Sequence, residues 1–316
     1  MTNILITGAG GFVGANLVHD LIKSKQNVSI VVRKQSNLWR LKNVLSHISV
    51  NYVDMTNIAE ISKVIKKIQP NIVYHLAAHG GYPFQQDLDI IIKTNLISSV
   101  NLMRALSTHC NQCTFVNTGS SSEYGPKQKA MRESDLTEPT SVYGITKLSQ
   151  TLFAKYFNQQ YNLHTITLRL FSVYGPYEEP GRLIHDMMMA LVGKKELELS
   201  SPKPRRDFVY MVDVISALKK AALVKDAKGK VFNIGSGRDY SVKDVLDIAC
   251  NVTDTKLKVK WGVEKKSRSF NSNSKWIADI TNANKILKWK PTISFREGLL
   301  KTYEWYHDNV KIYANR

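Results

Sequence analysis

The chain has 316 residues, 43% of them hydrophobic, so it is long enough to bury the core of one large domain or of two coupled domains. No basic and apolar leader precedes the first expected strand, and no apolar run approaches the roughly 18 residues of a membrane span. We therefore expect a soluble, cytoplasmic protein rather than a secreted or membrane-spanning one.

The formal net charge of +18 indicates an anionic partner, which is a phosphate-bearing ligand, nucleic acid or a membrane surface. The lysines are scattered along expected helices such as residues 61–68, not gathered in one block with interleaved aromatic side chains. A lysine-rich solvated surface is therefore the favoured interpretation, ahead of a nucleic-acid face.

The first expected strand, residues 4–7, leads into a glycine-rich turn and then into a segment with helical spacing; the turn reads Thr7-Gly8-Ala9-Gly10-Gly11-Phe12-Val13-Gly14. Glycines here let the backbone approach a ligand, and the following helix directs unpaired N–H groups and its positive dipole end toward an anion. Glycine-rich turns also serve simple tight packing. The strand before and the helix after this turn are, however, the context of a dinucleotide site, which we predict here.

Along the first half of the chain, short apolar segments typical of buried strands alternate with segments of helical periodicity. The expected strands are residues 4–7, 28–32, 49–53, 72–76, 114–117 and 165–170, and the expected helices are residues 12–24, 58–68, 88–106 and 142–160. This alternation predicts an α/β fold of the Rossmann type, a doubly wound parallel sheet with helices on both faces.

The pattern changes after Pro176 to proline- and glycine-containing loops with helices expected over residues 183–192, 214–223 and 242–250. We predict an NAD(P)-binding Rossmann domain over residues 1–175. Residues 176–316 form the smaller C-terminal substrate-binding region, with some segments returning to the first domain.

Metal binding and disulfides are not expected. The three cysteines, Cys110, Cys113 and Cys250, are too few and too unevenly placed for a disulfide framework, so reduced thiols are predicted. Cys110-x-x-Cys113 has the spacing of a redox or half-zinc motif, but no second pair accompanies it. His75 and His79 fall on an expected strand and its exit loop, not on one helix face.

Tyr143 and Lys147 lie four residues apart on an expected helix, hence on one face. A lysine cation near a tyrosine favours the phenolate, so the tyrosine can exchange a proton with a substrate oxygen near neutral pH. Such a pair is often only a solvated helix pair. The polar stretch from Asn117 to Gly125 follows the fifth expected strand, however, where ligands and catalytic groups collect in open α/β sheets.

At this point the chain resembles the extended short-chain dehydrogenase/reductase family, in its nucleotide-sugar epimerase/dehydratase/reductase branch. The resemblance runs essentially from end to end. It rests on Thr7-Gly8-x-x-Gly11-x-x-Gly14, His75-Leu76-Ala77-Ala78, Asn95, the serines before Tyr124-Gly125, Tyr143-x-x-x-Lys147, Leu168-Arg169-x-Phe171-x-Val173-Tyr174-Gly175-Pro176, Arg206-Asp207-Phe208-Val209-x-x-x-Asp213 and Asn233-Ile234-Gly235-Ser236-Gly237.

The resemblance implies that Ser120 hydrogen-bonds the reacting sugar oxygen, Tyr143 is the acid/base, and Lys147 holds the nicotinamide ribose. It also implies a cofactor-binding set: Gly8, Gly11, Phe12, Val13, Gly14, Arg33, Asp54, Met55, Leu76, Ala77, Ala78, Tyr143, Lys147 and Phe171. A homodimer is implied as well.

For the substrate, the resemblance implies that Arg206 contacts a nucleotide diphosphate, which suits the two-bond fork of a guanidinium. Arg268 is expected as a second clamp, although its surroundings lack the usual Pro-Gly-Asp continuation. Ser121 and Glu123 are expected substrate contacts; Glu123 has a structural role as its alternative. Dehydratases of the family place an acid pair directly after the catalytic Ser/Thr, and serines stand there in this chain, so elimination of water is not expected.

Arg33 at the end of the second expected strand indicates NADP, because an Asp there grips the ribose hydroxyls of NAD, whereas an Arg accommodates a 2′-phosphate. Ser36 and Arg40 are expected to assist, and NAD stays possible. The leading hypothesis is a reductase of a 4-keto nucleotide sugar, because net reduction suits an exchangeable NADPH. The alternatives are a nucleotide-sugar 4-epimerase that retains its cofactor and, in another class, a non-catalytic nucleotide-sensing or RNA-binding module of the same fold.

Overall fold

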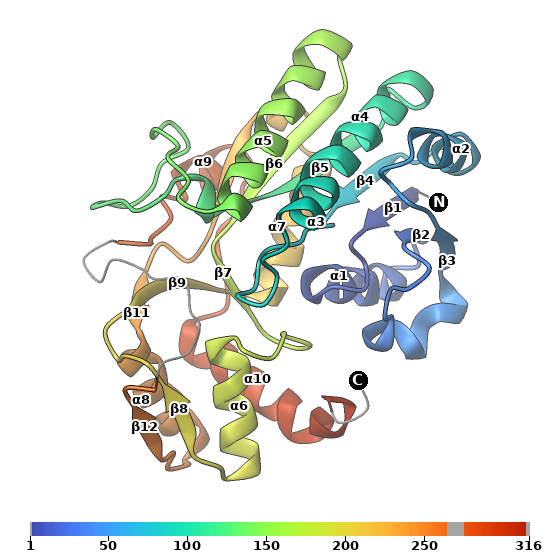
Figure 1. Cartoon of the computed structure of the whole chain (residues 1–316). Coiled ribbons are helices and arrows are strands. Elements are labelled where there is room, and N and C mark those ends of the chain that lie inside the picture. Colours follow the sequence, from blue (N-terminus) through green and yellow to red (C-terminus); the bar gives the residue numbers. More distant parts are fainter. Residues whose placement is uncertain (1, 264–274, 314–316) are drawn as a thin grey trace.

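The computed structural model describes residues 2–263 and 275–313. Its centre is a sheet of seven parallel strands in the order β10-β6-β5-β4-β1-β2-β3 (Figure 1). The strands are β1 (Asn3–Thr7), β2 (Asn27–Val32), β3 (Ser49–Tyr52), β4 (Ile72–His75), β5 (Thr114–Ser120), β6 (His164–Leu170) and β10 (Val231–Ile234). The predicted α/β fold is confirmed.

Apolar side chains point to both faces of this sheet, since successive residues of a strand alternate between faces. Ile4, Ile6 and Phe232 belong to the core on one face, beneath α1 (Phe12–Lys23), α7 (Met211–Leu223) and the 3₁₀ segment η1 (Trp39–His47). Leu5 and Phe115 belong to the core on the other, beneath α2 (Ile58–Ile68), α4 (Ser98–His109) and α5 (Val142–Tyr161). The sheet is therefore doubly wound, and no described helix is long and apolar enough to cross a membrane.

One expected helix is wrong in detail. Apolar spacing predicts a continuous helix over residues 88–106, but the structure divides this segment into α3 (Leu88–Ile92), the π-helical turn η2 (Lys93–Ile97) and α4. Asn95 lies in the π turn, where its side chain accepts from the N–H of His79 at 2.7 Å and donates to the His79 carbonyl and to Thr146 Oγ1. These tertiary bonds are invisible to a periodicity argument, and π turns are frequent at functional sites.

The second layer holds a mixed sheet of β7 (Ser172–Tyr174), β9 (Arg205–Tyr210) and β11 (Asp239–Ser241) and the pair β8 (Leu197–Leu199) and β12 (Val259–Trp261). Around them lie α6 (Leu183–Gly193), α8 (Val242–Thr253) and α10 (Phe295–Asn309), with a separate apolar core. The short segments η4 (Lys225–Ala227), α9 (Thr281–Lys285) and η5 (Val310–Tyr313) complete the fold. Although β10 follows residue 176 in the chain, it belongs to the large sheet; the division at residue 175 stays a prediction.

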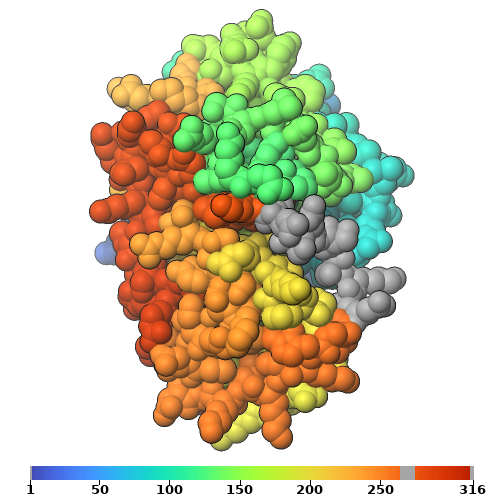
Figure 2. All heavy atoms as spheres, turned by 90° about the vertical axis from the view of Figure 1, so that its left-hand side faces the viewer, coloured from blue at the N-terminus to red at the C-terminus, as the bar shows by residue number. Residues whose placement is uncertain are grey.

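The segment over residues 124–141 joins the two layers beside the carboxyl ends of the large sheet. It follows the 3₁₀ turn η3 (Ser121–Glu123), and Figure 2 shows it in green above the yellow and orange segments of the second layer. Tyr124 Oη donates to Asn233 Oδ1 at 2.8 Å, and the Met131 N–H donates to the Ile277 carbonyl at 2.8 Å. The Asp207 N–H of β9 donates to the Trp276 carbonyl at 3.0 Å, so the chain around Ile277 links this segment to the second layer at the edge where the predicted site residues lie.

Candidate active site

Two adjoining cavities lie at the carboxyl ends of β1, β2, β4, β5 and β6 and share four lining residues, Gly8, Gly11, Leu76 and Ala78. The first runs from the glycine turn past Ser120 and Tyr143 to Arg206, and the second runs from the same turn to Arg33. One continuous space is therefore long enough for a dinucleotide with a substrate beside it.

The glycine turn has the geometry that an anionic cofactor needs. Gly8 has φ +72°, and a Cβ built on it would lie 2.5 Å from the Ala77 nitrogen, so a side chain is excluded. A Cβ on Gly14 would lie 2.2 Å from the Gly8 carbonyl oxygen, because helix α1 packs directly on the turn. No side chain caps the N-terminus of α1, and its first turn holds no acidic residue. Its N–H groups and dipole thus suit a pyrophosphate.

The predicted adenosine end lines the second cavity with Arg33, Asp54, Met55 and Ala77. Arg33 is exposed, and its backbone N–H donates to Ser36 Oγ at 3.0 Å, which shapes the loop after β2. Lys93, which the sequence analysis did not single out, adds a second cation to this cavity. Both cations suit a phosphate-bearing adenosine.

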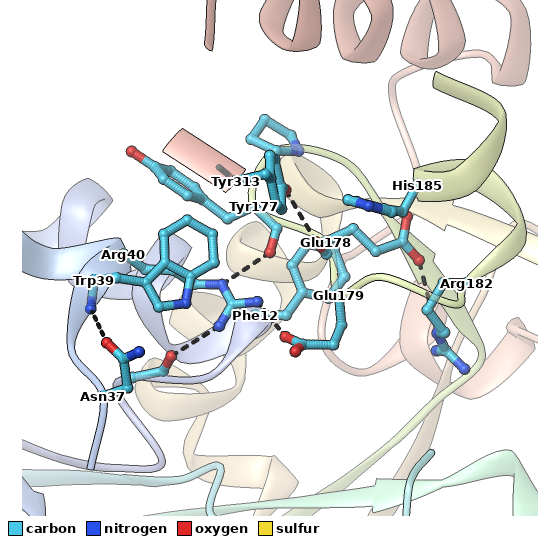
Figure 3. A network of polar contacts seen from close by, with 12 residues as sticks. Phe12, Asn37, Trp39, Arg40, Tyr177, Glu178, Glu179, Arg182, His185 and Tyr313 are labelled. Atoms are coloured by element: carbon cyan, nitrogen blue, oxygen red, sulfur yellow. Dashed lines mark hydrogen bonds and ion pairs between the residues drawn. The ribbon is translucent and has the colours of Figure 1, made fainter. Parts of the chain in front are cut away.

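Arg40 does not reach the second cavity, contrary to expectation. It is 6% exposed; its Nε donates to the Tyr177 carbonyl at 2.9 Å and its Nη1 to the Gly10 carbonyl at 3.2 Å. Figure 3 shows its guanidinium between Tyr177 and Glu179, which accepts an ion-pair bond from Nη2. With its donors directed into the protein, Arg40 is a structural residue and not a ligand for a 2′-phosphate.

Ser120, Tyr143 and Lys147 line the first cavity together. Ser120 ends β5, where its Oγ accepts from the N–H of Ser122 at 3.1 Å and so caps η3. Ser141 caps α5 by accepting from the Gly144 N–H at 3.1 Å, which sets Tyr143 in the first turn of the helix and Lys147 one turn later. The three side chains that the sequence predicts as catalytic thus converge from a strand end and a helix start.

Lys147 is 1% exposed, and its Nζ donates to Gln150 Oε1 at 2.5 Å. Burial lowers the pKa of Lys147 to about 8, because it disfavours the ammonium, while the carboxylate of Glu123 opposes this by favouring the charged form. The lysine therefore remains a cation at pH 7 and becomes neutral within the alkaline range of ordinary assays.

Glu123 is not placed to touch a substrate, which corrects one of the two expectations for it. Its side chain is fully buried: Oε1 accepts from the Ser120 N–H at 2.8 Å, and Oε2 accepts from Arg169 Nε at 2.8 Å and Thr151 Oγ1 at 2.9 Å. A Cβ on Gly119 would lie 2.4 Å from Oε1, so the strand passes closely over the carboxylate. Three donors from β5, β6 and α5 take up both oxygens, and the structural alternative is the one that fits.

Arg206 lies at the far end of the first cavity, where Arg182, Ser121 and Trp276 also line the wall. Its guanidinium carbon lies 5.4 Å from the centre of the Trp276 ring, and burial together with the charge of Arg182 lowers its pKa to about 10. Trp276 Nε1 donates to Ser121 Oγ at 2.8 Å. Two neighbouring guanidinium groups make this end suited to an anion such as a diphosphate.

Some of these cavity residues escaped the sequence analysis, and one predicted residue lies outside the part of the chain that the structure describes. Trp276 and Arg182 carry no spacing signal; only the Pro180-Gly181 turn before Arg182 hinted at a loop near the substrate. Phe171 lines the first cavity, as the resemblance implies. Arg268 lies outside the described residues.

His75 and the three cysteines sit in structural settings. His75 is fully buried between Thr7 Oγ1 and Ser99 Oγ, each at 2.7 Å from a ring nitrogen. Cys110, Cys113 and Cys250 carry no disulfide, and Cys110 Sγ donates to the Pro70 carbonyl at 3.1 Å. No group of three metal-ligating side chains gathers within the residues described.

A doubly wound sheet with a glycine turn after β1 and a Tyr-x-x-x-Lys pair at its carboxyl edge defines an extended short-chain dehydrogenase/reductase. The profile of the NAD dependent epimerase/dehydratase family matches residues 4–235, and the chain belongs to this family of enzymes. Of the curated relatives, an uncharacterized UDP-glucose epimerase of Bacillus subtilis is 27% identical over 94% of this chain and 95% of its own.

Solved structures of similar proteins agree with this assignment. UDP-glucose 4-epimerase of Thermotoga maritima, solved with UDP-glucose, is 26% identical, with a TM-score of 0.86 over 98% of this chain and all of that one. UDP-glucuronic acid 4-epimerase of Bacillus cereus, solved with UDP-glucuronic acid and NAD, is 28% identical, with a TM-score of 0.85 over 96% of this chain and 99% of that one.

Proposed function

We propose that the protein is a UDP-hexose 4-epimerase that retains NAD(P). The observation that carries the proposal is the convergence of Ser120, Tyr143 and Lys147 in a cavity bounded by the glycine turn at one end and Arg206 at the other. A nucleotide sugar fits this space with its diphosphate at Arg206 and its hexose beside Tyr143. The similar 4-epimerases solved with UDP-sugars support the same reaction.

The chemistry at C4 follows from the placement of the side chains. A nicotinamide held beside the glycine turn would supply the acceptor for the C4 hydride and the donor of a hydride to the other face of the sugar. Tyr143, as phenolate, removes the C4 hydroxyl proton and later returns it, while Ser120 hydrogen-bonds the same oxygen. The Lys147 ammonium favours the phenolate and holds the ribose hydroxyls of the cofactor. Arg206 holds the diphosphate while the hexose turns.

Dehydration is not part of the proposal, because that reaction needs an acid and base for the neighbouring carbons. Ser121 and Ser122 occupy the two positions after Ser120, and both line the cavity. A serine hydroxyl is neither acidic nor basic enough near neutral pH to take an acid pair's role.

One observation favours a second candidate, a 4-keto reductase that uses NADPH. Arg33 and Lys93 line the adenosine end of the cleft, where two cations suit a 2′-phosphate. NADPH is the usual donor of a net reduction, and the same Ser120, Tyr143 and Lys147 would reduce a 4-keto sugar in one step.

The two candidates are separated by whether turnover needs an added dinucleotide. We expect the purified protein alone to interconvert UDP-glucose and UDP-galactose, or the corresponding uronic acids, with the products identified by NMR. Heat denaturation should then release one dinucleotide per active chain. Turnover of a 4-keto sugar only with stoichiometric oxidation of NADPH would establish the reductase instead, and the absence of both reactions would contradict the site assignment.

We also propose that a second copy of this chain covers the outward face of α5. Ile145, Leu152, Phe153 and Tyr156 form one stripe on this helix and are between 37% and 55% exposed. A contiguous apolar stripe on a surface helix marks an interface. Leu152→Glu should convert a dimer to a monomer in light scattering, whereas Leu223→Glu on α7, 75% exposed, should not. A wild-type monomer at micromolar concentration would refute the proposal.

A further inference from the structure

A chain of buried hydrogen bonds connects the end of β1 with Lys147. Thr7 Oγ1 bonds His75 Nδ1 at 2.7 Å, and His75 Nε2 bonds Ser99 Oγ at 2.7 Å. Ser99 Oγ also bonds Gln150 Nε2 at 2.6 Å, and Gln150 Oε1 bonds Lys147 Nζ at 2.5 Å. All five side chains are at most 1% exposed, and they come from β1, β4, α4 and α5.

The direction of each bond follows from counting protons. Ser99 has one hydroxyl proton, which it donates to the Asn95 carbonyl at 2.6 Å, so it can only accept from its other neighbours. Gln150 Nε2 and His75 Nε2 must therefore both donate to Ser99 Oγ. Neutral His75 then carries its proton on Nε2, and its Nδ1 accepts from the Thr7 hydroxyl.

This bond pattern fixes which way the Gln150 amide faces. If the amide were reversed, its NH₂ group would point at the Lys147 ammonium and its oxygen would face Ser99, which has no proton left to donate. The carbonyl oxygen of Gln150 thus faces Lys147 in the only arrangement that satisfies every group. An unsatisfied buried polar group costs about 1 to 3 kcal/mol, so the reversed amide is less stable than the observed orientation by at least that amount.

We propose that Gln150, held by Ser99 and His75, is a positioning residue that keeps the Lys147 ammonium protonated and aimed at the cofactor and Tyr143. The inference rests on the proposed function only for the role of Tyr143; the contact of Lys147 with the cofactor ribose is independent of the sugar. The series of hydrogen bonds begins at Thr7, directly before the glycine turn, and ends at Lys147. It therefore connects the cofactor-binding turn with the catalytic helix α5.

The other groups around Lys147 leave a role for Gln150 in keeping its ammonium protonated. Burial lowers the pKa of His75 to about 3, with Lys147 adding to the shift, so His75 is neutral and contributes no charge. Glu123 from η3 favours the ammonium, but Arg169 from β6 shares its carboxylate at 2.8 Å. Tyr143 precedes Lys147 by one turn on α5. The carboxylate of Glu123 is thus already shared, and the Gln150 carbonyl is the acceptor that bonds Lys147 Nζ directly.

The test measures the affinity of the protein for NADH as a function of pH. The protein is first stripped of bound dinucleotide, and binding is measured by the fluorescence of NADH. Loss of the Lys147 proton should weaken NADH binding at alkaline pH; we call this decline in affinity the alkaline limb. Lys147→Met should abolish the alkaline limb. Gln150→Leu removes the acceptor and should move the limb down by about one pH unit, a tenfold change in proton affinity. Gln150→Glu keeps an acceptor, adds charge and should move it up.

Ser98 and Ser99 at the start of α4 provide a matched pair of variants in case Gln150→Leu does not fold. Ser99→Ala removes the anchor of Gln150, whereas Ser98→Ala removes a neighbouring buried hydroxyl that donates to the Lys93 carbonyl. Ser98 lines the adenosine cavity, so its removal can change the affinity for NADH but should not change the pH midpoint. We expect Ser99→Ala to lower the midpoint and Ser98→Ala to leave it in place. Equal midpoints for wild type, Gln150→Leu and Ser99→Ala, or a limb that persists in Lys147→Met, would overturn the proposal.

The same variants separate this inference from the proposed function. A wild-type protein that turns over no UDP-sugar but shows the shifted NADH limbs would refute the proposed function and support the role of Gln150. Normal epimerisation together with the same alkaline midpoint in wild type, Gln150→Leu and Ser99→Ala would support the proposed function and refute the role of Gln150.

Discussion

Arg40 and Glu179 form an ion pair across the junction of the cofactor turn and the loop that leads to the substrate cavity. The side chains are 5% and 22% exposed, and the same guanidinium donates to the carbonyls of Gly10 and Tyr177 (Figure 3). Arg182, at the end of that loop, lines the substrate cavity. The pair therefore joins the cofactor side of the site to its substrate side.

Breaking this pair should destabilise the fold far more than breaking a surface pair. Arg40→Met removes the guanidinium that pairs with Glu179 and bonds two carbonyls, and we expect a loss of about 3 kcal/mol in the free energy of unfolding, measured with urea. Arg132→Met is the control, because Arg132 is 65% exposed in its pair with Asp279, and its loss should be below about 1 kcal/mol. Similar losses for both variants would show that the junction is not structural.

Tyr143→Phe should lower kcat by roughly 10²- to 10⁴-fold, because it removes the proton-transferring group. NADH affinity should change little, since the ring remains. Steady-state kinetics and fluorescence binding measure the two effects. Near wild-type turnover by this variant would disprove the proposed role of Tyr143.

Arg206→Ala should weaken UDP binding by roughly tenfold to a hundredfold, because a charged hydrogen bond contributes about 1.5 to 3 kcal/mol. The diphosphate lies away from the reacting carbon, so KM should rise more than kcat falls. Titration calorimetry with UDP isolates the binding effect. Arg205→Ala is the matched control, as its neighbouring guanidinium pairs with Asp239 at 2.7 Å and does not line the cavity. Unchanged UDP affinity in Arg206→Ala would place the diphosphate elsewhere.

Arg33→Asp should shift the cofactor preference toward NAD(H) by at least about tenfold, since a carboxylate repels a 2′-phosphate and accepts from ribose hydroxyls. Competition between NADH and NADPH measures the ratio. Lys34→Asp changes the charge equally at an exposed neighbour that does not line the cavity, and it should leave the ratio nearly constant. Equal shifts in the two variants would mean that net charge, not Arg33, sets the preference.

Glu178 should make the fold less stable as the pH rises. Burial raises the pKa of Glu178 to about 8, well above the usual value near 4.3 that it has in the unfolded chain. Between these pH values the folded state binds the extra proton, so stability is full below about pH 4 and declines up to about pH 8. Glu178→Gln, which stays neutral, should lose at least about 1 kcal/mol less than wild type between pH 5 and 8.5.

Urea unfolding at several pH values measures this difference. Glu138→Gln is the control, because that carboxylate is 62% exposed, and its pH dependence should follow the wild type. If Glu178→Gln and wild type decline in parallel, the carboxyl is not neutral in the folded protein.

The local signals of the sequence determined the sheet and the core of the site. Strands and helices alternate with their own periods, and both Gly8 and Gly14 occupy positions where a Cβ has no room. The pair Tyr143 and Lys147 is one helical turn apart, so its joint orientation is a property of the helix alone. These features depend on neighbours within a few residues, which is why the sequence predicts them.

Only the tertiary structure decided which polar side chains reach the ligand cavity. Glu123 and Arg40 both look like ligand contacts in the sequence, yet each is turned inward by partners far along the chain: Arg169 for Glu123 and Glu179 for Arg40. Gln150 carries no motif and acquires its place through Ser99, 51 residues away. Whether a charge faces solvent, ligand or a buried partner depends on the balance of desolvation and pairing. That balance is set by contacts that exist only once the layers have packed.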